Sequence, residues 1–559
     1  MRTGLVIVLA VLALVVAARG LERRTTWYLA SDQFAFLTFA DDLRHGTVFH
    51  DATIVRRLSP YGHAPDVPVD ALFQTYIYRD GHLYSRYPPG FPLLLAAAGA
   101  IGGERAQHLL NPLLYLALLA ALGLGVGQLA GAAAGVAVMW ALLVVPAEVH
   151  YWGITVARDL PAHLLALVAV WAAWRGRTTL AGFVLGYACS IRPDAVLWGL
   201  AVGAVAPRLP LRTLVRGGLA FGVGLVPLLA YNTITQGHPF AFTQGSEFRH
   251  VLAATPPALL ASLVSGGGFR FAHLPATLPV HLRYLWDAFG LLLIPALGAL
   301  CIAVRRRAPI AGAFGPYAIV AFLFYSCWGH GDARYLVGVA LCLLALAAIG
   351  TAQGCRWLST GPWPWRLVAV AVIATILGVV PREHASRVRT VELALGGAAL
   401  VSLVLPPALA AVAPAAAMAT VGLTRVAQGS GERDPFQEPQ VDRARAAIEA
   451  LVPSGSLVLT TPSLGRPGEN ITHYTHADAS YLGETSAMGS SPAIAAQTVL
   501  GTGDQVFLLL GTLDPLPFVA DIREVARRDG PSLHDWFADP TRAPLGAVLY
   551  EVVGMTPPS

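Results

Sequence analysis

The feature that most constrains this chain is a series of long apolar segments that carry almost no charge. Of the 559 residues, 55% are hydrophobic and only 13% are charged. Several segments are apolar on every side, so they cannot be one-sided helices on the surface of a water-soluble protein. The sequence therefore predicts a mainly α-helical, polytopic membrane protein with about twelve or thirteen spans.

Two polar stretches interrupt the apolar segments. They are an external loop over residues 20–90 and a Gly- and Pro-rich connection over 232–284, which is too polar to be buried in lipid. Residues 91–101 are too few to span a bilayer and end at Gly102-Gly103, so we expect a re-entrant or surface helix there. The other expected spans are 106–128, a segment ending at Pro146, 160–174, 179–191, 195–207, 217–231, 288–304, 309–328, 334–350, 367–381 and a Pro-broken pair between 391 and 423.

The positive charges predict an orientation in the membrane. All 38 Lys+Arg residues are arginine. If the N-terminus lies inside, the arginine clusters at 175–177, 208–216, 305–307 and 356–366 all fall on the cytoplasmic side, as the positive-inside rule requires. The arginines at 19, 23 and 24 do not fit this pattern. The residues that then share the opposite face are Asp32, Asp159, Arg192, His330 and Arg334.

The composition changes near Arg425, after which short β-branched runs replace the long apolar segments. We therefore expect a transmembrane domain over 1–424 and a small α/β domain over 425–559, on the extracytoplasmic side. The expected elements of the second domain are an amphipathic helix around Ala444, Ile448 and Leu451 and strands at Leu457–Thr460, Val506–Leu510 and Ala547–Val553.

The first external loop holds an unusual number of ionisable groups close to the bilayer. Asp32 is followed by regularly spaced apolar residues from Phe34 to Leu43, a pattern that predicts a short amphipathic helix in the membrane interface. The positive end of the helix dipole would keep the Asp32 carboxylate ionised. In the plainer interpretation, Asp32 only caps this helix.

Three motifs resemble the type C glycosyltransferases, polytopic enzymes that take sugars from polyprenyl-phosphate carriers. An acid after the first membrane helix, an interfacial helix and the turn Tyr87-Pro88-Pro89-Gly90-Phe91-Pro92 resemble that family's first external loop. The sequence Arg158-Asp159-Leu160-Pro161 resembles its second external loop, and His330 to Tyr335 resembles its Arg-Tyr element near the carrier phosphate. The resemblance covers roughly residues 1–350 and is to protein O-mannosyltransferases and aminoarabinose-transferase-like enzymes. It favours a retained first helix over a cleaved signal peptide at residues 4–18.

The resemblance implies roles for particular residues. Asp32 would be the catalytic base and Asp159 a second carboxylate of the same site, and the two together could hold a divalent metal ion. Arg334 is suited to the carrier phosphate because a guanidinium donates in a planar fork and stays charged. The further candidates for the phosphate are Tyr335, Arg86 and His330.

Each of these residues also has a structural interpretation. Asp159 would be a helix N-terminal charge ahead of Pro161, and Arg86 with Tyr87 an interfacial anchor. We favour an internal ion pair for Arg192 and Asp194. The five cysteines form no CxxC pair, so neither disulfides nor a zinc site is expected.

The sequence thus predicts an inverting glycosyltransferase of the cell membrane, with its active site outside. Its partners would be a polyprenyl-phosphate-linked sugar, a lipid, glycan or protein acceptor, and membrane lipid, with no nucleic acid. One alternative is a transporter or flippase of lipid-linked sugars, which predicts an internal pseudo-symmetry that the sequence does not display. The other is a non-catalytic assembly protein of the cell envelope.

Overall fold

The structure of the chain is a computed structural model. It describes residues 2–20, 31–50, 69–71, 76–79, 82–144, 155–206, 210–240, 271–306, 308–328, 333–366, 368–369, 386–427, 451–453, 456–460, 478–481, 496–497, 500, 505–511, 521–528 and 547–554. Its contacts divide the chain into one unit of Met1–Glu22, Asn111–Ala230 and His250–Glu432, and another of Arg23–Leu110, Tyr231–Arg249 and Arg433–Ser559. This division groups the first external loop with the C-terminal residues, so the expected boundary at residue 424 stays a prediction.

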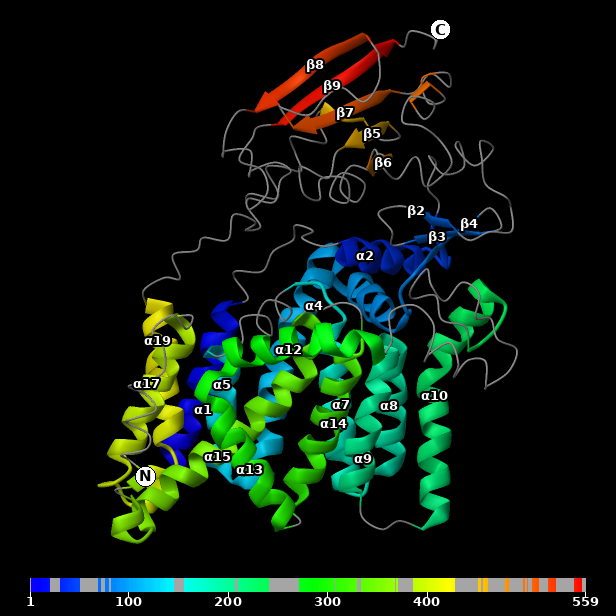
Figure 1. Cartoon of the computed structure of the whole chain (residues 1–559). Helices are drawn as coiled ribbons and strands as arrows, with labels where there is room; N and C mark the ends of the chain where they lie inside the picture. The colour runs from blue at the N-terminus through cyan, green and yellow to red at the C-terminus, as the bar shows by residue number, and fades with distance from the viewer. Residues whose placement is uncertain are drawn as a thin grey trace. The chain divides into compact units, whose positions relative to one another are not determined.

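The first unit is a bundle of apolar helices (Figure 1). Its helices are α1 (Arg2–Gly20), the second part of α4 (Gly90–Ala130), α5 (Ala132–Val144), α7 (Asp159–Trp174), α8 (Thr178–Ile191), η3 (Pro193–Trp198), α9 (Gly199–Val205), most of α10 (Leu211–Gln236), η5 (Phe271–His273), α12 (Leu274–Phe289), η6 (Gly290–Leu292), α13 (Leu293–Arg305), α14 (Pro309–Ser326), η7 (Ala333–Leu336), α15 (Val337–Thr360), α17 (Ser386–Val401), α18 (Pro407–Ala410) and α19 (Ala413–Ala427). The core of the bundle is almost entirely Ala, Leu, Val and aromatic side chains.

The expected class of a mainly helical membrane protein is confirmed. Among the described residues, four helical stretches are long and apolar enough to cross a bilayer, and apolar helices of 10–17 residues accompany them. The four are Gly90–Ala130, Leu211–Gln236, Phe271–Arg305 and Arg334–Thr360. The total number of spans stays a prediction, because most of the expected span at 367–381 lies outside the described residues.

The predicted break after residue 101 is confirmed. The long helix α4 is interrupted at Gly102 (φ −143°, ψ 23°) and Gly103 (φ 65°, ψ −161°). The positive φ of Gly103 lies outside the range that residues with a Cβ readily adopt. The apolar run from Gly90 is therefore a separate helical segment from the one that ends at Ala130.

Helices α8 and α10 approach each other closely through glycines. A Cβ atom placed on Gly182, Gly186 or Gly224 would collide with backbone oxygens of the facing helix. Ser190 Oγ donates to the backbone oxygen of Gly224 at 2.9 Å. Small residues that let backbones meet, joined by a hydroxyl bond, are typical of helix association inside a bilayer.

The described part of the first external loop belongs to the second unit. Helix α2 (Ser31–Arg44) has Asp32 in its first turn, which confirms the helix predicted after that residue. The strands β1 (Phe49–His50), β2 (Val69–Ala71), β3 (Tyr76–Arg79) and β4 (His82–Ser85) form an antiparallel sheet in the order β1-β4-β3-β2, which the sequence analysis did not foresee. Fully buried aromatic rings, among them Phe34, Phe36 and Tyr76, hold the loop together.

The C-terminal region contains a five-stranded mixed sheet. Its strands are β5 (Leu457–Thr460), β6 (Asp478–Tyr481), β7 (Val506–Gly511), β8 (Asp521–Arg528) and β9 (Ala547–Gly554), in the order β6-β5-β7-β9-β8. Strand β5 runs parallel to β6 and β7, while β9 is antiparallel to β7 and β8. The three predicted strands are confirmed, and β6 and β8 are additional. The amphipathic helix expected around Ala444 and Ile448 lies outside the described residues.

The connection expected over 232–284 is shorter than predicted. Helix α10 continues to Gln236 and α12 already begins at Leu274. Pro279 and the polar residues His281 and Arg283 obscured α12 in the sequence. His281 is nevertheless fully buried and lies 3.2 Å from the hydroxyl of Ser326.

Candidate active site

A buried ionic cluster lies at the head of α7. Asp159, the first residue of that helix, has no exposed surface. Its Oδ2 accepts a hydrogen bond from Nε of Arg334 at 2.8 Å, and its Oδ1 accepts one from Nη1 of Arg192. One carboxylate therefore holds two guanidinium groups that come from the end of α8 and from η7.

Arg192 connects Asp159 to a second carboxylate. Its Nε and Nη2 donate to the two oxygens of Asp194 at 3.0 and 2.9 Å, the bidentate geometry that suits this pair. The hydroxyl of Tyr325 also donates to Asp194. Pro193 forces Arg192 into an extended conformation (φ −139°, ψ 114°) that ends α8 and turns its side chain into the cluster. The expected internal ion pair is present, but it is one part of a larger network.

The described part of this cluster carries more positive than negative charge. Asp159 and Asp194 face Arg192 and Arg334, and the buried side chain of Arg158 adds a third guanidinium charge beside Asp159. Charges removed from water are costly unless they are compensated. The described cluster therefore brings three guanidinium groups and two carboxylates close together.

Aromatic rings fix the segment that carries Arg334. Tyr335 stacks on Tyr325, with ring centroids 5.5 Å apart and planes inclined by 25°. Trp328 lies 6.3 Å from Tyr335. Only 13% of the Arg334 side chain is exposed, so its orientation is restricted. His330, the neighbouring phosphate candidate, lies outside the described residues.

A second layer, which the sequence analysis missed, lies one turn below Asp159. Trp198 Nε1 donates to His163 Nδ1 at 3.2 Å, and the Trp198 ring stacks on Tyr317 at 3.7 Å between centroids. A Cβ atom on Gly338 would collide with both Tyr317 and His163, so α15 approaches through a glycine. The signal in the sequence was a histidine four residues after Asp159 in an otherwise apolar helix. This layer fixes the helix that carries Asp159.

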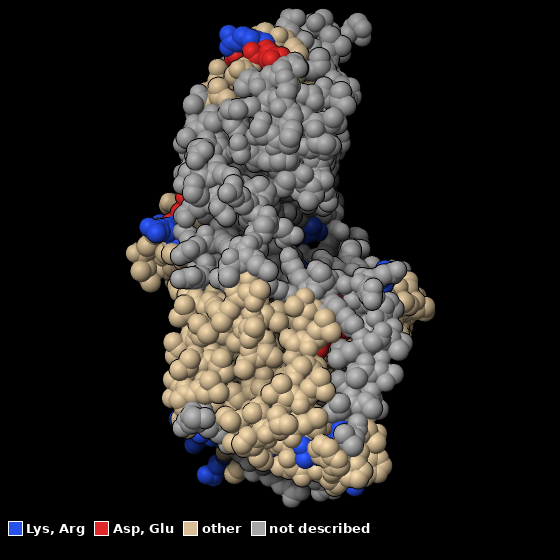
Figure 2. Space-filling model, turned by 90° about the vertical axis from the view of Figure 1, so that its left-hand side faces the viewer, with Lys and Arg blue, Asp and Glu red and all other residues tan. Residues whose placement is uncertain are grey.

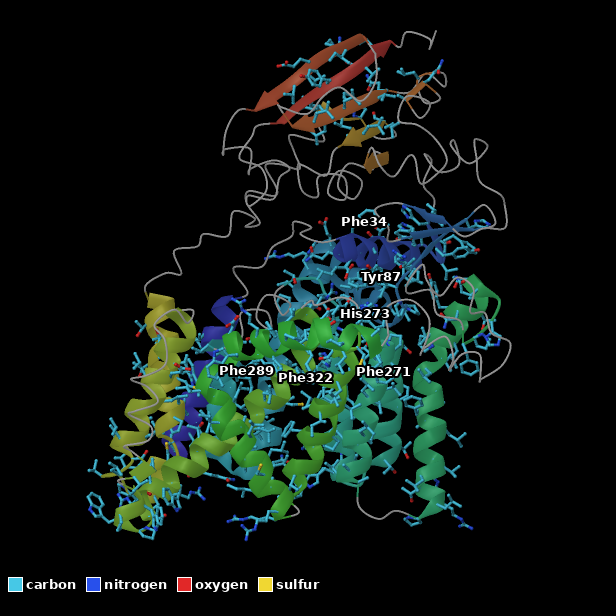
Figure 3. The ribbon with its side chains drawn as sticks, in the orientation of Figure 1. Phe34, Tyr87, Phe271, His273, Phe289 and Phe322 are labelled. Carbon is cyan, nitrogen blue, oxygen red and sulfur yellow. The ribbon has the colours of Figure 1, made fainter. Side chains whose placement is uncertain are left out.

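The second unit contains the other predicted carboxylate. The hydroxyl of Tyr87, a residue labelled in Figure 3, donates to Oδ1 of Asp32. The Tyr87 ring packs edge-on against Phe36, with the ring centroids 5.0 Å apart. Ser85 Oγ accepts from the backbone N–H of Tyr87 at 3.2 Å and so positions this residue. Arg86, between them, is partly buried. The predicted sharing of one site by Asp32 and Asp159 stays a prediction.

A polar cluster at the other end of α2 was not predicted as a site. Asp41 accepts from Gln107 Nε2 at 3.2 Å and from Arg44 at 3.1 Å. Asp42 lies 3.2 Å from His50, and burial raises the pKa of the Asp42 carboxyl although His50 opposes this shift. The cluster holds the C-terminal end of α2 against β1 and α4.

The chain resembles known proteins only in its three-dimensional structure. No protein-family model matches it, and no curated protein sequence does. ArnT from Cupriavidus metallidurans bound to undecaprenyl phosphate superposes with a TM-score of 0.56 at 17% identity, with 100% of both chains covered. The apo state of the same protein gives 0.55 at 16% identity, covering 100% of this chain and 99% of that one. The apo oligosaccharyltransferase of Archaeoglobus fulgidus gives 0.46 at 12% identity, with 90% and 69% covered.

The two superpositions on ArnT show the fold. The chain has the fold of the type C membrane glycosyltransferases, in agreement with the resemblance read from the sequence. Within that class, ArnT is similar to this chain over its full length.

The contacts of Asp159 bear on whether a divalent metal ion can bind there. Both oxygens of Asp159 accept from guanidinium groups, so a metal could bind there only by displacing them. Within the described residues, no three His, Cys, Asp or Glu side chains are placed to hold an ion. The described contacts of Asp159 therefore do not fit a metal ion bound to this carboxylate.

Proposed function

We propose that this chain is an integral-membrane glycosyltransferase that takes a sugar from a polyprenyl-phosphate carrier. The observation that carries the proposal is the partly exposed Arg334, held by a buried carboxylate at the head of a helix in a type C glycosyltransferase fold. Such a group can bind the phosphate of the carrier and stabilise the charge that develops as it leaves. ArnT was crystallised with undecaprenyl phosphate, which belongs to this class of lipid.

In this proposal Asp159 and Arg192 position the phosphate-binding group. Asp159 is fully buried and already shared by two guanidinium groups, so it is poorly placed to take a proton from an acceptor. It accepts a hydrogen bond from Nε of Arg334 and so fixes the direction of that side chain. Tyr335, Arg86 and His330 are further candidates for contacts with the phosphate.

Asp32 serves as the general base. It stands in the first turn of α2, where the helix dipole favours its ionised form, and the Tyr87 hydroxyl orients it. The carboxylate accepts the proton of an acceptor hydroxyl, and the oxygen forms a bond to the anomeric carbon. The bond from that carbon to the phosphate oxygen breaks on the opposite face, so the configuration inverts and polyprenyl phosphate leaves. The acceptor is a lipid, a glycan or a protein.

The positions of the arginines indicate which side of the membrane the proposed active site faces. The described turns after α7 and α13 carry arginines and lie at one end of the bundle, while the head of α7 lies at the other (Figure 1). Figure 2 shows basic residues gathered at the lower end of the apolar surface. Because positive residues stay in the cytoplasm, the proposed active site faces the extracytoplasmic side of the cell membrane.

A vesicle assay tests the proposal. The purified protein is reconstituted with a pool of polyprenyl-phosphate-linked sugars and a membrane extract that supplies lipid, glycan and protein acceptors, and mass spectrometry follows the release of polyprenyl phosphate. An enzyme consumes the lipid-linked sugar, a flippase moves it unchanged, and an assembly protein does neither. Arg334→Ala should abolish the release. Arg283→Ala, which removes an 84% exposed arginine of α12, is the matched control and should not. If the wild-type protein consumes no lipid-linked sugar from the pool, the proposal is wrong.

A further inference from the structure

An apolar cavity lies in the first unit, at the end of the bundle opposite the head of α7. Its volume is about 220 Å³. The last turns of α4 and α7 form most of its wall, and Val205 and Phe314 contribute from α9 and α14. None of its described lining residues belongs to the candidate active site.

Hydrogen bonds join a glutamine, a tryptophan and an arginine at one side of this cavity. The side-chain oxygen of Gln128, which lines the cavity, accepts from Trp171 Nε1 at 3.0 Å and from Arg175 Nη2 at 2.6 Å. The guanidinium of Arg175 lies over the rings of Trp171 and Trp174, 5.4 and 5.3 Å from their centroids. Both rings line the cavity, so cation–π contacts with its wall hold Arg175 at the mouth.

The segments around the mouth of the cavity carry only positive charge. The segments that form the cavity, residues 121–131, 167–181, 200–206 and 308–316, contain no Asp or Glu. Arg177 follows Arg175 in the same exposed turn between α7 and α8. Two guanidinium groups at the edge of an apolar slot match a ligand with an anionic head and a hydrocarbon tail.

We infer that this cavity binds an anionic phospholipid, with one acyl chain in the slot and its phosphate on Arg175 and Arg177. The cavity has room for a small polar ligand, since its volume equals about seven water volumes. Its apolar wall, however, would leave most hydroxyl groups of a sugar ring without hydrogen-bond partners. Lipid is the solvent around these helices, and basic residues beside tryptophans at a helix end are typical of contact with an anionic leaflet. The inference does not depend on the proposed sugar transfer.

Photolabelling of the full-length protein tests this inference. Nanodiscs contain phosphatidylglycerol and phosphatidylcholine in equal amounts, one of them with a photoreactive group in its acyl chain, and peptides are mapped by mass spectrometry. Labelling of residues 121–129 and 167–174 by phosphatidylglycerol should exceed that by phosphatidylcholine by about fivefold or more. Equal labelling by the two lipids would overturn the inference.

Two variants test the binding of the lipid headgroup and the binding of the acyl chain separately. Arg175→Gln with Arg177→Gln should bring the labelling ratio close to one, whereas Arg212→Gln with Arg216→Gln, at the same end of the bundle but away from the cavity, should leave it unchanged. Gly125 lines the cavity, and a side chain there meets open space.

Gly125→Leu should therefore fill the slot and exclude both lipids. Its control is Gly222→Leu, at a glycine of α10 that also faces open space. Undiminished labelling in Gly125→Leu would show that the lipid lies outside the cavity. If the double arginine variant fails to fold, the wild-type ratio and Gly125→Leu still decide.

Discussion

The guanidinium Nε of Arg334 lies 2.8 Å from a carboxylate oxygen of Asp159, although 175 positions separate the two residues in the chain. This contact joins the start of α7 to the short η7 helix ahead of α15. The Arg334 side chain makes this contact through Nε, one of the donors of its planar guanidinium group. A single buried acid thereby sets the direction in which a positive group points.

The first prediction concerns this geometry. Arg334→Lys keeps the charge but cannot contact Asp159 and a phosphate through one planar fork. The apparent affinity for the lipid-linked sugar should therefore fall about tenfold or more, with little change in thermal stability. Steady-state kinetics over a range of donor concentrations measures this, with Arg283→Lys as control. Unchanged donor affinity would make Arg334 a structural anchor and leave Arg86 as the preferred phosphate ligand.

The second prediction concerns the base. Asp32→Asn removes the proton acceptor but keeps a residue that caps helices well, so transfer should fall by about a hundred- to ten-thousandfold while the protein still folds. Asp159→Asn should reduce transfer less completely. Its unfolding must be measured in parallel, because it removes the charge that compensates two buried guanidinium groups. If Asp32→Asn retains more than about a tenth of wild-type activity, Asp32 is a cap and the base is another carboxylate, such as Glu148.

The third prediction concerns orientation. In a cysteine-free background, single cysteines at Gly81 and Gly331 should react with an impermeant reagent in intact cells, whereas one at Arg177 should react only after permeabilisation. The reason is the collection of arginine-bearing turns at one end of the bundle. Protection of Gly81 or Gly331 would reverse the proposed arrangement. A cysteine at Ser463 reports on the C-terminal domain separately, since its protection alone would relocate only that domain.

The fourth prediction concerns helix packing. Gly224→Ala places a methyl group against the backbone of α8, so it should destabilise the protein by about 1–3 kcal/mol. Gly222→Ala, two positions away on the same helix, meets open space and should be neutral or stabilise by up to about 1 kcal/mol. Thermal unfolding in detergent, followed by tryptophan fluorescence, compares the two. Equal effects would show that α8 and α10 do not meet through these glycines.

The fifth prediction concerns pH. Burial raises the pKa of Asp42 above its ordinary value of 3.8, so the folded state prefers the protonated acid. The resulting stabilisation is complete below the unfolded pKa and is lost as the pH rises through the higher folded pKa. Asp42→Asn removes this loss, so the variant should unfold at a higher temperature than the wild type at pH 7. The difference should shrink as the pH approaches 4. A variant that is less stable than the wild type at pH 7 would mean that the pair with His50 outweighs burial.

The sequence predicted those elements whose local pattern is strong. The strands at 457, 506 and 547, the helix after Asp32 and the break at Gly102-Gly103 all follow from periodicity, turn residues or glycine. The sequence did not predict the strands β6 and β8. Strand β8 lies at a sheet edge and mixes charged and apolar residues without regular alternation, so only its pairing with β9 identifies it. Helix α12 was missed because its apolar residues lie on one side and proline interrupts it.

The site was predictable in its parts but not in its connections. Local motifs singled out Asp32, Asp159 and Arg334, because each combines a charge with a helix end near the membrane. The link from Arg192 to Asp159 and the layer of His163 and Trp198 depend on contacts between residues 33 and 35 positions apart. A pattern within one segment carries no information about such contacts.

The ionic cluster around Asp159 takes all its positive charge from arginine, in a chain without lysine. A guanidinium keeps its proton at every pH at which proteins remain folded, whereas an ammonium group loses it in alkaline solution. The affinity of this cluster for a phosphate would therefore not fall in the alkaline range. A plot of rate against pH for this protein would report the acids, histidines and tyrosines around the substrate, and not these arginines.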